Sequence, residues 1–485
     1  MQTEQCPHLG LWIEGRSMPA ADGAEMPVHD PATGTTIALV AQTGEKDVAA
    51  AVEAARRAYE EGDWHGFGPG ERAAALRRLA DLLRAHQEEI ARIEMQNVGK
   101  PIRSARSEVG YAARVFDYYA GILSTIGGQT VPLAAKGTGL TFREPLGVCG
   151  LIVPWNFPLV ITSWKVAPAL AMGNTVVLKP AEWTPLSALR LAELAIEAGI
   201  PAGVLNVTPG LGPVAGAALA RHPAVRKIAF TGSTTTGSQI LRMAAEDIKR
   251  VSLELGGKSA SIVFADADLD KAAASVMSVF DNTGQDCCAR SRYLVERGIY
   301  EEFVDRFAAH TQALRVGDPQ EEATDLGPLV SPVHRERVEG YVRQGVEEGA
   351  RLRLGGQAPL DSALAQGCYY APTIFTGVSP QMTIAQKEIF GPVVAMIPFD
   401  GEAEAIRLAN ATIYGLSGSI WTRDIGRALR VARALETGVL SINSSSSVHL
   451  EMPFGGFKQS GIGRELGPAA LEQYSELKSV FIAAD

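Results

Sequence analysis

Two adjacent cysteines, Cys287 and Cys288, occur in the segment TGQDCCARSR and are the side chains that most directly suggest chemistry. A thiolate is a strong nucleophile, so the pair predicts covalent catalysis, and a buried, unreactive thiol pair is the alternative. Zinc-binding cysteines are usually separated by about two to four residues, and the eight histidines form no HExxH-like cluster. We therefore expect a nucleophile here and no metal.

Two further polar residues could assist such a nucleophile. Glu254 lies between two leucines in SLELGGKSA, where desolvation raises a carboxyl pKa and suits a general base. The alternative for Glu254 is a helix or strand cap paired with Lys258. Asn156 lies between two prolines in VPWNFP, which restrict the backbone around it. Its amide can donate to an oxyanion if this loop lines a cleft, and otherwise it serves only the loop backbone.

Turns that follow strand-like segments indicate a phosphate-binding site. KIAFTGSTTTG joins a strand to a helix, which directs backbone amides and a helix N-terminus toward a phosphate, although the GxGxxG fingerprint is absent. A second turn, PGLGP (residues 209–213), fits a tight connection equally well. Lys179 and Glu182 in TVVLKPAEWTP follow a strand end, where an acidic side chain can accept hydrogen bonds from both ribose hydroxyls.

The elements that must position these residues alternate along the chain. From Gly147 onward short apolar runs alternate with helical segments, the last of which begins at about Ser238, and a second such stretch runs from about Ser259 to Gly438. This alternation predicts two successive open parallel-sheet α/β domains. Single helices are expected over about 71–95 and 269–281. The terminal segment SVFIAAD is predicted to be a strand that pairs elsewhere in the molecule.

Length, charge and cysteine content limit the possible functions. The 485 residues correspond to about three folding units, and a formal charge of −9 argues against nucleic acid or an anionic membrane as a partner. Residues 145–164 carry no charge, but Pro154 and Pro158 argue against a membrane helix and favour a buried strand leading into a loop. Five cysteines and an N-terminus unlike a secretory signal predict a cytoplasmic protein.

Seven motifs in this order resemble those of the aldehyde dehydrogenase superfamily: VPWNFP, LKPAEWTP, FTGSTTTG, LELGGKS, GQDCCARSR, EIFGPV and PFGGFKQSGIGRE. Their wording is most similar to that of broad-specificity and amino aldehyde dehydrogenases. The resemblance covers nearly the whole chain and implies a cofactor-binding domain (1–122 and 146–256) and a catalytic domain (257–455). It also implies a small β oligomerisation flap (123–145 and 472–485), which bridges the subunits of a homodimer or homotetramer in that family.

The resemblance assigns roles to individual residues. Cys287 corresponds to the nucleophile, because the pattern GQxCxAxSR leaves Cys288 in a variable position. Glu254 corresponds to the base that activates water, and Asn156 with the backbone NH of Cys287 to the oxyanion hole. The residues expected to contact the cofactor are Val153, Trp155, Lys179, Glu182, Gly212, Gly232, Ser233, Gly237, Leu255, Glu388 and Phe390. Those expected to line the substrate tunnel are Tyr111, Phe157, Ile161, Trp164, Asp286, Cys288 and Val448.

The implied reaction oxidises an aldehyde to a carboxylic acid, with NAD preferred over NADP as hydride acceptor. It passes through a thiohemiacetal and a thioester on Cys287, and Glu254 promotes hydrolysis. The alternatives are an acylating enzyme that transfers the thioester to coenzyme A, and an inactive relative that keeps only the scaffold. The aldehyde itself stays open: Asp286 could attract the cation of an ω-amino aldehyde, or bond to a backbone NH, Arg290 or Arg292.

Overall fold

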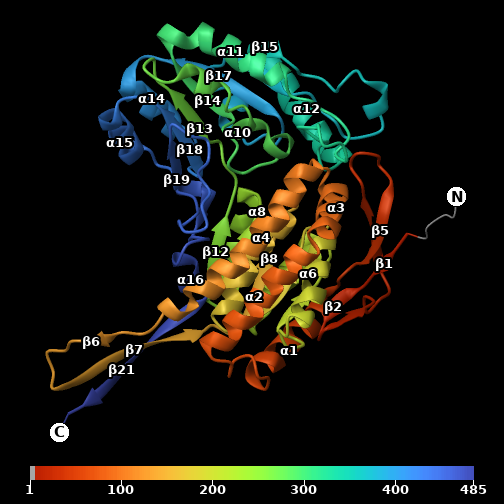
Figure 1. Ribbon diagram of the computed structural model, residues 1–485, viewed down its shortest axis with the longest axis vertical. Coiled ribbons are helices and arrows are strands. Elements are labelled where there is room, and N and C mark those ends of the chain that lie inside the picture. The colour runs from red at the N-terminus through yellow and green to blue at the C-terminus, as the bar shows by residue number, and fades with distance from the viewer. Residues whose placement is uncertain (1–5, 485) are drawn as a thin grey trace.

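The computed structural model describes residues 6–484 and holds two large sheets, one in each half of the molecule (Figure 1). The first sheet has eight strands, of which the middle five are parallel and those at both edges antiparallel. In spatial order they are β20 (Gly461–Ile462), β12 (Arg250–Glu254), β11 (Val225–Thr231), β8 (Val148–Ile152), β9 (Thr175–Lys179), β10 (Leu205–Val207), β2 (Leu11–Ile13) and β3 (Arg16–Met18).

The second sheet has seven strands, and only its edge strand β15 runs antiparallel to its neighbour. Its strands in spatial order are β15 (Arg351–Leu354), β16 (Thr373–Thr376), β17 (Val393–Phe399), β14 (Arg292–Glu296), β13 (Ala260–Val263), β18 (Ser417–Trp421) and β19 (Val439–Ile442). The helices packed around it are α9 (Leu269–Ala273), α10 (Met277–Phe280), α11 (Tyr300–Gln312), α12 (Pro332–Glu347), α13 (Thr383–Gln386), α14 (Gly401–Asn410) and α15 (Ile425–Ala434). Two successive α/β units with mainly parallel sheets confirm the predicted fold class.

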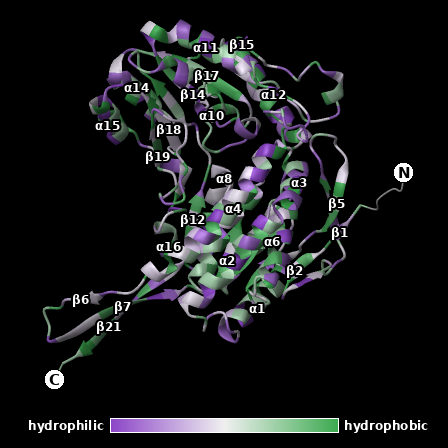
Figure 2. Ribbon diagram, in the orientation of Figure 1, coloured by the Kyte–Doolittle hydropathy of each residue, from purple (hydrophilic) through white to green (hydrophobic). Residues whose placement is uncertain are grey.

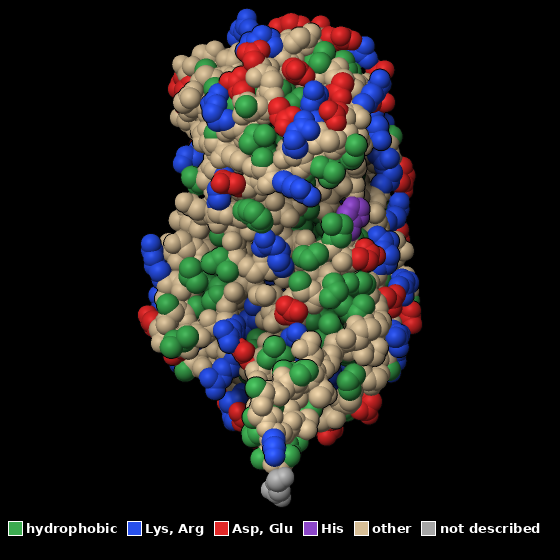
Figure 3. Space-filling model, turned by 90° about the vertical axis from the view of Figure 1, so that its left-hand side faces the viewer, with side chains coloured by type: hydrophobic (Ala, Val, Ile, Leu, Met, Phe, Trp, Pro, Cys, Tyr) green, Lys and Arg blue, Asp and Glu red, His purple; other side chains and the backbone are tan. Residues whose placement is uncertain are grey.

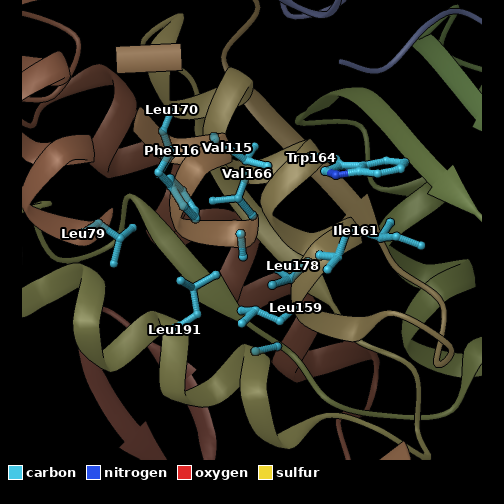
Figure 4. Close-up of a cluster of buried hydrophobic side chains, with 14 of the residues drawn as sticks. Leu79, Val115, Phe116, Leu159, Ile161, Trp164, Val166, Leu170, Leu178 and Leu191 are labelled. Carbon is cyan, nitrogen blue, oxygen red and sulfur yellow. The ribbon is translucent and has the colours of Figure 1, made fainter. Parts of the chain in front are cut away.

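Helices cover both faces of the first sheet, and the largest apolar core lies on one of them. Figure 4 shows this core, where Leu79, Phe116 and Leu170 meet from three different helices. The helices on this face are α2 (Pro69–Ala85), α3 (Gln87–Val98), α4 (Ile102–Ile122), α5 (Pro158–Ala171) and α6 (Leu186–Glu197). The other face is covered by α1 (Glu45–Glu60), α7 (Ala217–Arg221) and α8 (Thr234–Ala245). A core of this size fixes the strand ends that carry the polar residues.

Two helices that the sequence predicted as single pieces are divided. Residues 71–95 belong to α2 and α3, which meet at His86, whose backbone (φ −101°, ψ 18°) is not helical. Residues 269–281 contain α9 and α10, and between them the Ser275 hydroxyl donates to the Ala272 carbonyl at 2.7 Å. A side chain that bonds to the backbone competes with the helical ladder, which explains the second break.

Two small sheets complete the fold. One consists of β1 (His8–Leu9), β5 (Thr36–Ala41) and β4 (Glu25–His29). The other projects from the body and consists of β21 (Ser475–Ala483), β7 (Gly137–Pro145) and β6 (Thr130–Val131), with hydrophobic residues along β7 and β21 (Figure 2). The terminal strand β21 pairs antiparallel with β7 over its full length, and the short helix α16 (Ala469–Glu472) precedes it.

The uncharged stretch 145–164 forms the end of β7, the buried strand β8, a loop at 153–157 and the first half of α5. This agrees with the prediction of a strand leading into a loop. Among residues 6–484, no helix combines the length and the apolar character needed to cross a bilayer.

Candidate active site

The loop at 153–157 leaves the C-terminal end of β8, in the middle of the parallel strands, and places Asn156 in the interior. The Val153 amide donates to the Lys179 carbonyl at 3.1 Å, which continues the β8–β9 pairing into the loop. The Asn156 side chain donates through Nδ2 to the Gln285 carbonyl at 2.9 Å. The amide therefore faces the segment that carries the cysteine pair, as an oxyanion donor must.

The loop before Cys287 has an unusual backbone. Asn282 (φ 48°), Thr283 (φ 57°) and Gly284 (φ 73°) all adopt the left-handed conformation. For residues other than glycine this costs about 1–3 kcal/mol each, so other contacts must hold the loop. Asn282 donates through Nδ2 to the Asn156 carbonyl at 2.9 Å, and the Thr283 hydroxyl donates to a main-chain carbonyl at 2.8 Å. The loop that carries Asn156 and the loop before Cys287 are thus hydrogen-bonded to each other in both directions.

The two cysteines differ in their surroundings. Cys287 is half-buried and lines a cavity, whereas Cys288 is buried at 6% exposure. Asp286 accepts a hydrogen bond through Oδ1 from the Cys288 amide at 2.8 Å, which is one of the two roles considered for this carboxylate. A hydrogen bond to the Cys288 thiol, together with burial, raises the pKa of Cys287. The resting side chain is therefore a thiol that needs a proton acceptor.

Glu254 ends strand β12 and is buried at 3% exposure. Neither of its carboxylate oxygens has a hydrogen-bond partner among residues 6–484, and no salt bridge to Lys258 forms there. Burial raises the pKa of Glu254 well above its usual value, and the nearby Glu465 carboxylate raises it further, while Lys165 opposes both. A buried carboxyl group with an elevated pKa is suited to accept a proton near neutrality.

Lys165 and Glu465, which form a buried ion pair, are residues that sequence reasoning did not select. Lys165 is the only charged residue of the apolar helix α5, and Glu465 closes the motif PFGGFKQSGIGRE. Both facts were signals available in the sequence, but their pairing is a tertiary contact.

A cavity of about 170 Å³ joins several of these elements. It is lined by Pro154, Trp155, Asn156, Trp183, Thr231, Gly232, Ser233, Leu255, Gly256, Cys287, His334, Arg337, Glu388 and Phe390. Six of the residues expected to contact a cofactor are in this lining, beside the nucleophile candidate and Asn156. Ser233 is the N-cap of α8, where it accepts a hydrogen bond from the Thr236 amide at 3.2 Å. The helix thus directs its N-terminus toward the cavity, as the turn GSTTTG predicted.

The cavity lining also includes Glu388 and Phe390. Glu388 accepts a hydrogen bond from the Gly257 amide at 2.9 Å, and burial raises its pKa to about 7. Phe390 has a left-handed backbone (φ 62°), and its carbonyl accepts a 2.6 Å hydrogen bond from His334 Nε2. Burial lowers the pKa of His334 to about 4, so the ring is neutral and can donate from this nitrogen. His334 carries no motif signature and was missed.

The other residues expected to contact a cofactor lie outside the cavity lining. Lys179 ends β9 and donates to the Glu182 carboxylate at 3.2 Å, so both are at the carboxyl edge of the sheet as predicted. Gly237 packs against the Leu255 side chain, which does line the cavity. Gly212 begins the turn after β10 and has open space beside it. For Val153 the structure shows only the main-chain hydrogen bond from its amide to the Lys179 carbonyl.

Aromatic side chains gather on the other side of the cysteine pair. Ile161 and Trp164 project from α5, one turn apart (Figure 4). The Trp164 ring lies 6.5 Å from that of Tyr111 and 5.1 Å from that of Phe454, measured between centroids. The residues expected to line a substrate tunnel that belong to this apolar cluster or pack against it are Tyr111, Phe157, Ile161, Trp164, Cys288 and Val448. Phe454 joins them and was not predicted.

Comparisons with known proteins agree with this geometry. The sequence model described as "Aldehyde dehydrogenase family" matches residues 18–480. The chain is 45% identical to the putative aldehyde dehydrogenase DhaS of Bacillus subtilis over 97% of this chain and 95% of that protein. It is 42% identical to a betaine aldehyde dehydrogenase of the same organism over 97% and 96%. The solved NAD+ complex of an aldehyde dehydrogenase from Bacillus cereus superimposes with a TM-score of 0.96 at 45% identity, covering 99% of this chain and 97% of that one.

Proposed function

This chain belongs to the aldehyde dehydrogenase family, and from this premise we propose that Cys287, Asn156 and Glu254 carry its reaction as nucleophile, oxyanion donor and base. The enzyme oxidises an aldehyde to a carboxylic acid with NAD as hydride acceptor. The observation that favours hydrolysis over transfer to coenzyme A is the carboxylate of Glu254, which is buried and unpaired among the described residues. An acylating enzyme has less need of such a base.

The residues around the cavity fit NAD. The N-terminus of α8 with Ser233 suits a pyrophosphate, and the Glu388 carboxylate suits ribose hydroxyls. Gly256 supports this fit, because a Cβ atom there would lie 2.3 Å from Glu388 Oε2. The rings of Trp155 and Phe390 are in edge-to-face contact, with centroids 5.2 Å apart, and line the same cavity as Cys287, where they offer an apolar surface to a flat ring system. Bound NAD supplies the hydride acceptor at this position.

Oxidation begins when the Cys287 thiol loses its proton and its sulfur attacks the aldehyde carbon, giving a thiohemiacetal. The carbonyl oxygen becomes an oxyanion, to which the Asn156 Nδ2 group and the Cys287 amide donate. Collapse of the oxyanion with loss of hydride leaves a thioester on Cys287. The thiol proton is released to solvent, so this half-reaction depends on Cys287 and Asn156 and leaves Glu254 for the next one.

Hydrolysis then depends on Glu254, which is suited to act as a base because burial raises its pKa. Its carboxylate accepts a proton from water, the resulting hydroxide attacks the thioester, and the acid leaves as the sulfur is released. The buried Lys165–Glu465 pair lies close enough to influence the Glu254 charge. We expect the two half-reactions to be separable by mutation because they rely on different residues.

The test is an NADH-formation assay with a simple aldehyde, with and without coenzyme A, followed by product analysis. Free carboxylic acid, formed at a rate that coenzyme A does not change, is the expected result. Acyl-coenzyme A as the product would identify the acylating alternative. An absence of NADH with every aldehyde, from a protein that still binds NAD, would identify an inactive relative.

For the substrate we propose a neutral, apolar aldehyde. Tyr111, Trp164 and Phe454 form an aromatic surface, and one oxygen of Asp286 already accepts a backbone hydrogen bond. A panel of kcat/KM values for hexanal, benzaldehyde, 4-aminobutyraldehyde and betaine aldehyde tests this. Higher values for the two cationic aldehydes would instead favour the amino aldehyde expected from Asp286 and cation–π attraction.

We also propose that the projecting sheet of β6, β7 and β21 joins copies of this chain into a dimer or tetramer. This sheet and the turn between β6 and β7 expose Leu133, Phe142, Leu477, Phe481 and Ile482. Figure 3 shows apolar side chains on the lower part of the molecule, from which the sheet projects. The associated domain division is 1–122 with 146–256, 257–455, and 123–145 with 472–485, in a cytoplasmic enzyme. Light scattering should give the mass of a dimer or tetramer for the wild type. The Phe481→Glu variant should have a lower mass, because the oligomer is lost.

A further inference from the structure

A buried lysine, Lys100, lies directly behind the loop that carries Asn156. It occupies the turn between α3 and α4, and its side chain has no exposed surface. Desolvating an ammonium ion is costly, so such a residue persists only where specific partners surround it. The partners of Lys100 therefore indicate the role of its buried positive charge.

Lys100 Nζ contacts two carboxylates and one loop carbonyl. It forms an ion pair with Glu108 on α4, and the Glu94 carboxylate on α3 lies 3.9 Å away. It donates to the main-chain carbonyl of Asn156 at 3.1 Å, and it lies 4.6 Å from the centroid of the Phe157 ring. One face of the ammonium group is thus neutralised by acids, and the other is directed at two consecutive loop residues.

The Asn156 carbonyl has a second donor, the Nδ2 group of Asn282 at 2.9 Å, from the left-handed segment before Cys287. Two donors occupy both lone pairs of this carbonyl. They approach from different parts of the chain, one from the N-terminal helices and one from the loop of the nucleophile. The peptide group of Asn156 is fixed by this pair of bonds, and with it the direction of the side-chain amide.

We infer that Lys100 is a positioning residue, which holds the Asn156 carbonyl so that the side-chain amide faces the oxyanion formed at Cys287. The inference rests on the proposed role of Asn156. Glu108 has a supporting part, because it balances the buried charge. Burial raises the pKa of Glu108 to about 8, so this acid can take up a proton when Lys100 is replaced. A neutral lysine replacement therefore does not leave a bare carboxylate in the interior.

The experiment measures single-turnover hydride transfer, seen as the first NADH formed after rapid mixing with aldehyde. Lys100→Met should slow this step by about 10- to 100-fold, the scale expected for misplacing a catalytic group, and leave the KM for NAD within about twofold. Lys100→Arg, which keeps a donor, should recover part of the rate. Lys227→Met is the matched control, since Lys227 is also fully buried but donates to Ser252 Oγ at 3.0 Å. It should change stability without slowing hydride transfer beyond about twofold.

The double variant Lys100→Met/Glu108→Gln separates positioning from stability. Removing both charges should return the melting temperature toward that of wild type, while the rate stays low because the Asn156 carbonyl still lacks its donor. Recovery of the rate together with the melting temperature would overturn the inference, since Lys100 would then act only through stability.

A cycle with Asn156→Ala tests the route of the effect. If Lys100 acts through Asn156, Lys100→Met should slow an Asn156→Ala enzyme by less than about twofold, because the group it positions is already gone. Fully additive losses would overturn the inference, as would a normal rate for Lys100→Met beside a slow Asn156→Ala. A normal rate for Asn156→Ala alone would instead reject the proposed oxyanion role, which is a distinguishable failure.

Discussion

The two sides of Cys287 are built from different interactions. On the side that we propose for the cofactor, polar groups are fixed by hydrogen bonds: a main-chain amide donates to Glu388, and a neutral histidine donates to the carbonyl of Phe390, whose backbone is left-handed. On the side that we propose for the substrate, the rings of Tyr111 and Trp164 pack against each other, and their Oη and Nε1 atoms have no hydrogen-bond partner within residues 6–484. The first side selects a ligand by the direction of its polar groups, and the second by volume and shape.

This difference implies that the two sides can be altered independently, whereas changes at their junction affect the whole reaction. Directional contacts depend on single residues, so one substitution should remove a definite preference. Apolar packing is shared among many atoms, so one substitution should shift the substrate range without abolishing turnover.

Cys287→Ala removes the thiol that lies between the two sides and should have the largest effect on activity. We expect dehydrogenase activity to fall by more than about 10,000-fold, as when a covalent nucleophile is lost. Cys288→Ala, the matched control next to it, should keep activity within about tenfold, which is about 1.4 kcal/mol of barrier. Mass spectrometry after limited iodoacetamide treatment should find the label on Cys287 first. Preferential labelling of Cys288 with loss of activity would reverse the assignment.

Glu254→Gln should stop the reaction after hydride transfer. A burst of NADH equal to the enzyme concentration should precede turnover that is about 100- to 10,000-fold slower than in wild type. Only the carboxylate accepts a proton from water, and burial raises the pKa of Glu254, so wild-type hydrolysis should accelerate as pH rises through that elevated pKa. The variant should lose this rise in its kcat profile. An enzyme without a burst would place Glu254 before hydride transfer.

Glu182→Ser should alter the cofactor side alone. The Glu182 carboxylate, 3.2 Å from Lys179 Nζ, would repel a 2′-phosphate, so wild type should prefer NAD. Its removal should narrow the ratio of kcat/KM for NAD over NADP by about tenfold, near the size of one partly screened charge contact. The order of preference among aldehydes should stay the same. Equal use of both cofactors by wild type would remove this role from Glu182.

Asp286→Asn gives the smallest expected change and sharpens the description of the substrate side. Asparagine keeps an oxygen for the Cys288 amide, so KM should change by less than about threefold, and equally for hexanal and 4-aminobutyraldehyde. A several-fold rise confined to the amino aldehyde would show that the carboxylate attracts a cation. The aromatic surface would then not be the main determinant of substrate choice.

Much of the site follows from sequence because its residues stand at the ends of strands. Glu254 ends β12, Lys179 ends β9, and the Asn156 loop follows β8, all at the carboxyl edge where parallel strands place ligand contacts. Local signals are sufficient there: an apolar run, a turn and a polar residue. The division into two α/β units was predictable for the same reason.

The residues that escaped prediction act through contacts distant in sequence. His334 reaches a carbonyl 56 residues away, and Lys165 pairs with Glu465 across 300 residues. Lys100 holds a loop 56 residues further along. The break at His86 has neither proline nor glycine to mark it. Periodicity and propensity describe neighbours in sequence, so they carry no information about which buried groups meet across the fold.

The pairing of β20 with β12 has a consequence for the order in which the enzyme is made. Gly461 pairs with Glu254, and Glu465 reaches back to Lys165, so the surroundings of Glu254 are completed by a residue translated 300 positions after Lys165. At about 5–20 residues per second, this interval is about 15–60 s on the ribosome. Cys287 is therefore translated before the residues that complete the surroundings of Glu254. We therefore expect activity only from a chain that extends through β20 and Glu465.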